Sequence, residues 1–260
     1  MDLGLKQRVV LITGGSRGIG LACAKTFLHE GARVAIASRS REHLDRAAAE
    51  LAGSGPVATF VADLARPEDA ASLANRAEKQ LGPIDVLVNS AGAAKRYLPE
   101  ALGVDAWHDA MDAKYFTYVH AMEAVLPRMR ERRRGAVVNI IGMGGKIAGP
   151  MHLPGGAANA ALMLASVGLA SVYGRHGVRI NAINPGQTMT DRVKEFLALE
   201  SKARGVDEQA LLADMQAKLP LGRIAQPEDV ANLALFLASD KASYLTGVIV
   251  PMDGGANPII

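Results

Sequence analysis

Short runs of Val, Ile and Leu alternate with longer amphipathic stretches along the whole chain. The short runs lack polar alternation, which is typical of strands buried on both faces of a parallel sheet. They predict strands at Val9–Ile12, Val34–Ala37, Val57–Val61, Ile84–Val88, Val137–Ile141, Val178–Ile183 and Val248–Val250. The intervening stretches have apolar residues at helical spacing. They predict helices at Gly18–His29, Glu42–Leu51, Pro67–Leu81, Ala106–Glu131, Gly155–Tyr173, Glu208–Lys218 and Glu228–Leu237.

Strands and helices in alternation need crossover connections, which are right-handed and place helices on both faces of a parallel sheet. No linker or internal repeat divides the chain, and its 260 residues suit one large α/β domain. We therefore expect residues 1–260 to form a single doubly wound α/β domain of the Rossmann type with about seven strands.

A glycine-rich turn follows the first predicted strand, with the sequence Thr13-Gly14-Gly15-Ser16-Arg17-Gly18-Ile19-Gly20. Gly14 can adopt backbone angles that let the chain turn sharply off the strand. Gly18 and Gly20 have no Cβ, so a phosphate group and a neighbouring strand can approach closely. The N–H groups and the dipole at the start of the next helix attract an anion. A strand, a glycine turn and a helix in this order predict a site for a dinucleotide pyrophosphate.

Composition and charge narrow the class of partner. Apolar residues make up 49% of the chain and charged residues 21%, which indicates a packed core rather than disorder. The net charge is only +3 and forms no stripe, so we expect no nucleic-acid partner. The main basic run, from Arg128 to Arg134, closes a predicted helix, where cations suit the negative end of the dipole. We interpret it as a solvated helix end.

Cys23 is the only cysteine, so the chain has no internal disulfide. Its position among small residues predicts a buried thiol rather than a nucleophile. The six histidines show no metal-ligand spacing, and no metal is expected. Neither a secretory leader nor a membrane-spanning run is recognisable, so we expect a cytoplasmic protein without a membrane partner.

Further motifs follow the later predicted strands. They are Asp63-Leu64, Asn89-Ser90-Ala91-Gly92, Asn184-Pro185-Gly186 with Thr190, and Asp253-Gly254-Gly255. With the glycine turn, these motifs make the sequence resemble the short-chain dehydrogenase/reductase family over essentially its whole length, although Ser90 replaces a family Asn. The resemblance implies that Asp63 meets the adenine ring and that the segment 184–190 lies beside the nicotinamide. The cofactor-binding residues that we expect are Gly14, Ser16, Arg17, Gly18, Ile19, Gly20, Ser38, Arg39, Asp63, Leu64, Asn89, Ala91, Gly92, Asn159, Pro185, Gly186, Thr188 and Thr190.

The end of the second strand indicates which dinucleotide is bound. An NAD enzyme generally has Asp or Glu there, to bind the ribose hydroxyls. In this sequence Ser38 occupies that position and Arg39 follows it, while Arg17 lies within the glycine turn. Hydroxyl and guanidinium donors suit a 2′-phosphate, and the missing carboxylate removes a repulsion. We therefore expect NADP, with NAD the less favoured cofactor.

The resemblance fails at the family's catalytic positions. The family uses a Tyr as proton donor, a Lys four residues later, a Ser at the end of the fifth strand and an Asn in the preceding long helix. Alignment on flanking residues places Gly155 at the Tyr position, Asn159 at the Lys position, Gly142 at the Ser position and Lys114 at the Asn position. The cofactor motifs are intact, so the proton relay is the part that differs.

Three side chains are candidates for the missing proton donor: His152, Tyr118 and Lys114, in that order. His152 lies three residues before Gly155, and its imidazole titrates near neutral pH without tuning. Tyr118 lies one helical turn after Lys114, on the same face. Three structural alternatives stay open: a surface lysine, a core or interface tyrosine, and a solvent-exposed loop histidine.

These features favour an NADP(H)-dependent oxidoreductase that acts on a small carbonyl or alcohol through a non-standard proton relay. Two alternatives remain: a nucleotide-binding sensor or scaffold without catalysis, and a non-redox enzyme of the same fold. Lys95 and Arg96 follow the Asn89 motif and would suit an anionic substrate, and a solvated surface is the alternative that stays open. Family resemblance implies a substrate flap around residues 189–216 and a homotetramer or homodimer.

Overall fold

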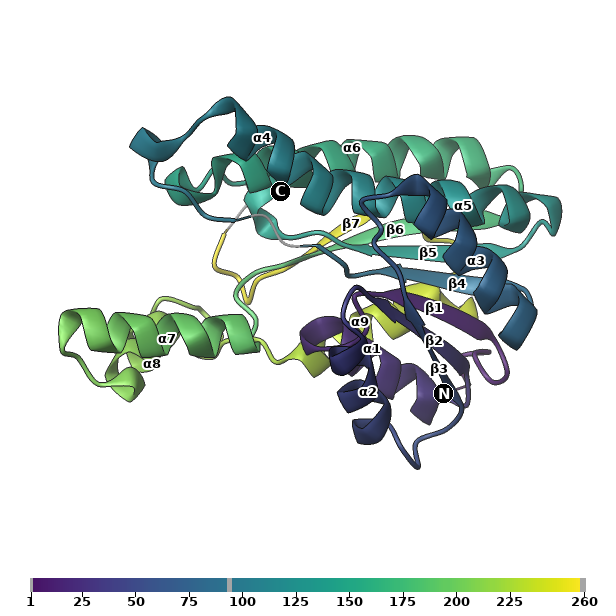
Figure 1. The fold of residues 1–260 in the computed structure, drawn as a ribbon, viewed down its shortest axis with the longest axis horizontal. Helices are drawn as coiled ribbons and strands as arrows, with labels where there is room; N and C mark the ends of the chain where they lie inside the picture. The colour runs from purple at the N-terminus through teal and green to yellow at the C-terminus, as the bar shows by residue number, and fades with distance from the viewer. Residues whose placement is uncertain (1, 93–94, 258–260) are drawn as a thin grey trace.

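A seven-stranded parallel sheet forms the centre of the molecule (Figure 1). The computed structural model describes residues 2–92 and 95–257. The strand order is β3-β2-β1-β4-β5-β6-β7. The strands are β1 (Val9–Thr13), β2 (Arg33–Ser38), β3 (Val57–Val61), β4 (Ile84–Asn89), β5 (Gly135–Ile140), β6 (Val178–Pro185) and β7 (Ile249–Met252). The order reverses between β1 and β4, where such sheets bind ligands at their carboxyl edge. The predicted fold class is confirmed.

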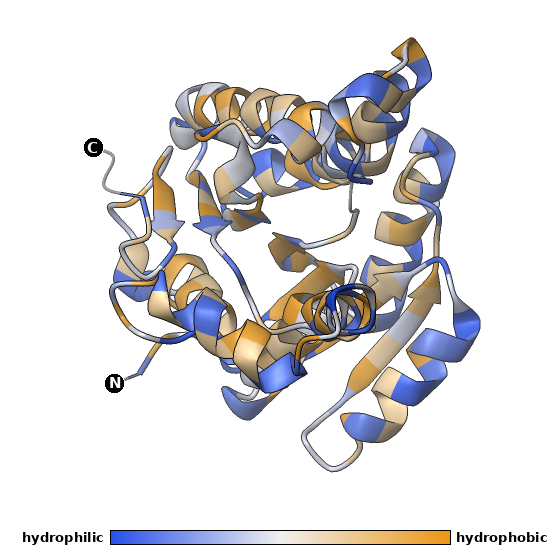
Figure 2. Cartoon of the chain, turned by 90° about the vertical axis from the view of Figure 1, so that its left-hand side faces the viewer, coloured by the Kyte–Doolittle hydropathy of each residue, from blue (hydrophilic) through white to orange (hydrophobic). Residues whose placement is uncertain are grey.

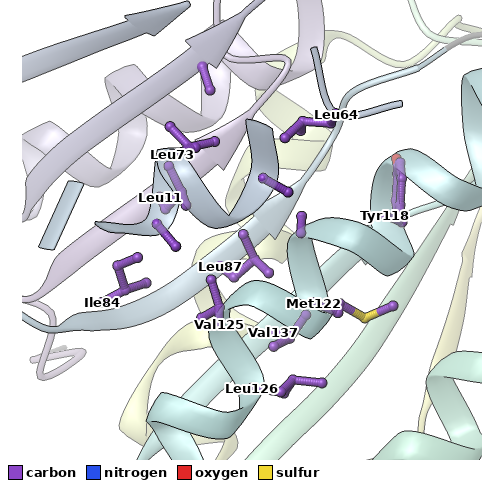
Figure 3. Close-up of a cluster of buried hydrophobic side chains, with 14 of the residues drawn as sticks. Leu11, Leu64, Leu73, Ile84, Leu87, Tyr118, Met122, Val125, Leu126 and Val137 are labelled. Carbon is purple, nitrogen blue, oxygen red and sulfur yellow. The ribbon is translucent and has the colours of Figure 1, made fainter. Parts of the chain in front are cut away.

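Alternate residues of each strand enter two separate cores, one on each face of the sheet. In β1, Val10 and Ile12 pack on one face, whereas Val9 and Leu11 pack on the other. The first core is covered by α1 (Gly18–His29), α2 (Arg41–Glu50) and α9 (Pro227–Ala238). The second is covered by α3 (Pro67–Leu81), α5 (Thr117–Glu131) and α6 (Leu153–Gly174) (Figures 1 and 3). Burial of both faces explains why the strands have no polar alternation.

The long helix predicted over Ala106–Glu131 is interrupted. It consists of α4 (Val104–Ala110), a π-helical segment (Met111–Phe116) and α5. A π-helical turn accommodates an extra residue in the helix, and such turns are frequent at functional sites. Hydrophobic spacing could not reveal this break, because the apolar positions before and after it both fit a helix. The π-helical segment contains Lys114.

The predicted flap consists of two helices that project from the body (Figure 1). They are α7 (Asp191–Arg204) and α8 (Glu208–Ala217). The sequence analysis predicted α8 but not α7. The limits of α7 have recognisable causes, because Thr190 is its N-cap and Gly205 ends it with a left-handed φ of 65°. Leu197 is a buried residue of α7, while Phe196 and Leu199 of the same helix are exposed. In Figure 2, where the projecting helices face the viewer, hydrophilic and hydrophobic residues are mixed along them.

The stretch around α6 is unusually apolar. Among residues 2–92 and 95–257, Pro150–Gly174 is the one helical stretch whose length and composition would allow it to cross a membrane. A core helix has the same composition, and α6 contributes Leu162, Met163 and Ala170 to the second core. Its outer face carries the exposed Leu164 and Val172.

The basic run at the end of α5 is partly paired with α3. Arg128 Nη1 lies 2.7 Å from Glu78 Oε2, and Arg132 Nη1 lies 3.0 Å from Glu78 Oε1. Burial opposes the charge on Glu78, but hydrogen bonds from Arg128 and from the Ile84 N–H lower its pKa below the usual value. The interpretation of the whole run as a solvated helix end is therefore wrong for Arg128 and Arg132.

We expect Glu78→Gln to lower the free energy of unfolding by about 1 kcal/mol at neutral pH, since the pairs are partly screened. The folded-state pKa of Glu78 is lowered. Its stabilisation is therefore fully present above the unfolded pKa and is lost as the pH falls through the folded one. Urea titrations at pH values from neutral to acidic should show that the difference in free energy of unfolding between the wild type and Glu78→Gln becomes smaller in acid. Glu42→Gln, in an exposed pair with Arg46, is the control. A difference that stays constant with pH would contradict this account.

Candidate functional site

The glycine turn is held against both neighbouring strands at the carboxyl edge of the sheet. The N–H groups of Gly14 and Gly15 donate to the Ala37 carbonyl at 2.8 and 3.3 Å, which fixes the turn beside the end of β2. On the other side, a Cβ at Gly14 would lie 2.7 Å from the Ala91 Cα. Gly14 also has a φ of 67°, so both its backbone angle and its contacts require glycine.

Residues from distant parts of the sequence meet around this turn. A Cβ at Gly18 would lie 3.4 Å from Thr190 Cγ2, so the loop after β6 contacts the start of α1. Gly186 packs in the same way against Asp253, because a Cβ there would lie 2.9 Å from the Asp253 Cα. The structure therefore brings together the glycine turn, the Asn89 motif and the segment 186–190, as parallel-strand geometry predicts. Ser16, Pro185 and Thr188 are buried in this region, while Ile19 and Gly20 begin α1.

A buried chain of polar side chains braces the same edge. Thr13 Oγ1 donates to Asn89 Oδ1 at 3.2 Å, and Asn89 Nδ2 donates to Asn139 Oδ1 at 2.9 Å. Asn139 Nδ2 in turn donates to Ser166 Oγ on α6 at 2.9 Å. Thr13 Oγ1 also accepts from the N–H groups of Ser90 and Ala91. Thr13 therefore holds the turn that leads to Gly92, and Asn89 ties Thr13 to Asn139 inside the sheet.

The sequence analysis missed Asn139 and Ser166. One signal was available for Asn139, since it is a polar residue in the apolar run from Val137 to Ile141. Its partner on α6 could not be identified without the helix–sheet packing.

The predicted adenosine end has a different character, because its polar residues are half-buried or exposed, although Leu64 is buried. Arg17 and Arg39 are exposed, and Ser38 is half-buried at the end of β2. Asp63 accepts from the Ala65 N–H at 3.2 Å. The Leu64 carbonyl accepts a hydrogen bond from His120 Nδ1 at 2.9 Å, which fixes this loop on α5. Two guanidinium groups therefore lie exposed near a strand end without a carboxylate at residue 38.

Lys114 lies on the opposite wall and is 7% exposed. Its Nζ donates to Tyr118 Oη at 2.8 Å and to the Ile140 carbonyl at 3.1 Å. Nζ also lies 4.4 Å from the centroid of the Tyr118 ring, within cation–π range. The π-helical segment thus directs Lys114 toward the end of β5, just before Gly142. The alternative of a surface lysine is excluded by this burial.

Tyr118 lies inside the second core (Figure 3). It is fully buried, and its hydroxyl donates to the Ile140 carbonyl at 2.5 Å. Burial raises the pKa of the hydroxyl well above its usual range. This placement argues against the prediction that Tyr118 itself gives a proton to a substrate, because its proton is already used inside the protein.

The loop after β5 and the start of α6 form the remaining wall. A Cβ at Gly144 would lie 3.0 Å from His152 Cδ2 and 3.6 Å from Asn159 Nδ2, so both side chains contact this loop. His152 ends the turn Pro150–His152 and is half-buried, which differs from a freely solvated loop residue. Gly155 and Asn159 are both buried on the inner face of α6.

Gly142 has a backbone conformation that only glycine adopts readily, with φ 133° and ψ 150°. A Cβ there would have ordinary contact with Asn159 Nδ2 at 3.4 Å. We therefore expect Gly142→Ala to lower the free energy of unfolding by about 1–3 kcal/mol through backbone strain rather than a clash. Gly103→Ala is the control, because a Cβ at this exposed site meets nothing within 4 Å and its φ of −119° suits any residue. Equal losses of free energy of unfolding in the two variants, measured by denaturant titration, would contradict the explanation by backbone strain.

This sheet, with a glycine turn at its topological switch point, defines an α/β protein of the Rossmann type. The family model described as enoyl-(acyl carrier protein) reductase matches residues 14–257. The 2-(S)-hydroxypropyl-CoM dehydrogenase 3 of Xanthobacter autotrophicus is 36% identical over 260 residues, covering 98% of each chain. The Bacillus subtilis protein named uncharacterized oxidoreductase YvrD is 34% identical over 259 residues, again covering 98% of each.

A solved structure of L-sorbose reductase from Gluconobacter frateurii, complexed with NADPH and L-sorbose, superposes with a TM-score of 0.95. It is 29% identical in sequence, and the match covers 100% of both chains. The chain belongs to the short-chain dehydrogenase/reductase family and is an oxidoreductase of that type.

Proposed function

We propose that this protein is an NADP(H)-dependent oxidoreductase that interconverts a small carbonyl compound and its alcohol. One observation carries the choice of cofactor: the intact dinucleotide cradle has Ser38 and the exposed Arg39 at the ribose end, where an NAD site would have an acid. Arg17, exposed at the N-cap of α1, adds a second guanidinium. The L-sorbose reductase structure and a polyketide ketoreductase structure, at TM-scores of 0.95 and 0.92, were both solved with NADPH.

In this proposal the bound cofactor supplies or accepts a hydride, and the chain has to hold the substrate oxygen and move a proton. Gly142, Gly155 and Asn159 occupy the positions of the family's Ser, Tyr and Lys. Lys114 then provides the positive charge that stabilises the developing oxyanion. His152, which lies beside Gly144, then exchanges the proton with the substrate.

The substrate that we propose is small and anionic. The names of gluconate 5-dehydrogenase and L-sorbose reductase support the small size, whereas a 3alpha-hydroxysteroid dehydrogenase and a polyketide ketoreductase are named for larger compounds. The charge is supported by Arg96 and by Lys95, which are exposed beside the loop that carries His152, although Lys95 Nζ also lies 3.9 Å from Asp109 Oδ2. The N–H of Tyr97 donates to the Met151 carbonyl at 3.1 Å, which joins the two segments.

The test is a search for cofactor consumption with purified protein. We expect NADPH absorbance to fall with at least one small keto acid or keto sugar, and NADPH to bind more tightly than NADH in calorimetry. Tight NADPH binding without consumption across the panel would favour the sensor or scaffold. Conversion of a substrate without net loss of NADPH would favour a non-redox enzyme. Binding of neither nucleotide would overturn the proposal.

We further propose a cytoplasmic homotetramer. The exposed Leu164 and Val172 on α6 and the exposed Tyr244 and Leu245 before β7 are two separate apolar surfaces that identical copies could cover. Light scattering on the purified chain should give four times the mass of one chain. A monomer at micromolar concentration would contradict this assembly.

A further inference from the structure

We propose that Tyr118 is a positioning residue, whose hydroxyl holds the Lys114 ammonium at the reaction site. This inference rests on the proposed function, and it replaces the direct proton donation that the sequence analysis assigned to Tyr118. It is carried by a triangle of three hydrogen bonds that join Lys114 Nζ, Tyr118 Oη and the Ile140 carbonyl.

The direction of each hydrogen bond is fixed by chemistry. An ammonium group only donates, and a carbonyl only accepts. Lys114 Nζ therefore donates both to Tyr118 Oη and to Ile140, and the Tyr118 hydroxyl proton goes to Ile140. In this arrangement the tyrosine oxygen accepts from Lys114 Nζ, and the Ile140 carbonyl accepts from both side chains.

The triangle also connects two elements of the site. Ile140 ends β5, two residues before Gly142, so the bonds tie the ammonium to the strand that carries the Gly142–Gly145 loop. The Thr117 hydroxyl donates to the Lys114 carbonyl at 2.8 Å and so holds the backbone of the π-helical segment. Tyr118 thereby fixes the side chain of Lys114, while Thr117 fixes its main chain.

The experiment compares Tyr118→Phe with the wild type in steady-state kinetics. Phenylalanine keeps the ring and its packing but removes the hydroxyl, and we expect kcat to fall about tenfold, the effect of one hydrogen bond to a charged group. The dissociation constant for NADPH should stay unchanged, because Tyr118 lies in the core away from the glycine turn. Tyr173→Phe, which removes the hydroxyl of a tyrosine packed on the same core at the far end of α6, is the matched control.

A double mutant separates positioning from general stability. In the Lys114→Met background, adding Tyr118→Phe should cause no further loss of kcat, since the hydroxyl acts only through the ammonium. The double mutant contains no Lys114 ammonium that requires the Tyr118 hydroxyl as an acceptor. It can therefore still be compared with Lys114→Met if Tyr118→Phe alone folds poorly. A further loss of about tenfold in the Lys114→Met background would overturn the inference.

The inference and the proposed function can fail separately. Wild-type kcat in Lys114→Met would reject the role of Lys114 in the proposed function. A low kcat in Lys114→Met together with wild-type kcat in Tyr118→Phe would reject only the role of Tyr118. Equal losses in Tyr118→Phe and Tyr173→Phe would assign the effect to packing and would also reject it.

Discussion

Replacing Lys114 by methionine is expected to lower kcat for carbonyl reduction at least about tenfold, because a developing oxyanion then loses its cationic partner. Methionine retains the unbranched shape of lysine, so the space between α5 and β5 stays filled. The NADPH dissociation constant should change little, since the Lys114 amine contacts Tyr118 and Ile140 rather than the glycine turn. Stopped-flow or steady-state measurements of NADPH oxidation give kcat, and calorimetry gives the dissociation constant for NADPH.

Lys146→Met is the control for this substitution. Lys146 is exposed on the loop that contains Gly142, so its loss changes the net charge near the site without removing a buried ammonium. We expect its kcat to match the wild type. Equal losses in the two variants would mean that overall charge, rather than the placement of Lys114, controls the rate.

His152→Ala tests the proposed proton donor of the relay. Loss of a general acid or base commonly costs about a hundredfold or more in rate, and a partial role would leave a smaller effect. His29→Ala, at the exposed end of α1, is the control. Full activity in both Lys114→Met and His152→Ala would reject the proposed relay.

The fold could be predicted from the sequence because buried strands and amphipathic helices each have a characteristic local pattern of apolar residues. Buried parallel strands must be apolar on both faces, so runs such as Val9–Ile12 are recognisable without any tertiary information. The break at Met111–Phe116 and the largely polar helix α7 were not predicted. The break leaves the spacing of apolar residues intact, and α7 buries too little surface to show a clear helical period.

The same distinction between local sequence patterns and tertiary packing applies to the candidate site. The cofactor residues could be identified because close backbone approach demands glycine, and glycines at fixed spacing are visible in a sequence. That Gly18 and Thr190 lie at the same edge of the sheet could be expected, because both follow the carboxyl ends of parallel strands. In contrast, the bonds that join Asn139 to Ser166 and Tyr118 to Ile140 depend on helix–sheet distances. The sequence placed Tyr118 beside Lys114 but could not say that its hydroxyl points into the core.

Ser38→Asp is expected to exchange the cofactor preference of the protein. A carboxylate at the end of β2 repels a 2′-phosphate and accepts hydrogen bonds from the ribose hydroxyls of NADH. We expect NADPH affinity to fall about a hundredfold, which corresponds to loss of about 2.7 kcal/mol, while NADH affinity rises. Calorimetric titration of both nucleotides against the wild type and the variant measures the ratio directly.

Arg39→Ala separates attraction from repulsion at this position. It removes an exposed guanidinium without adding a negative charge, so NADPH binding should weaken by about tenfold while NADH binding stays unchanged. Arg46→Ala, exposed on α2 and paired with Glu42, should affect neither nucleotide. If Arg39→Ala weakened both nucleotides equally, Arg39 would bind the part they share rather than the 2′-phosphate. The assignment of NADP would then rest on Ser38 and Arg17 alone, and the corresponding variant of Arg17 would decide it.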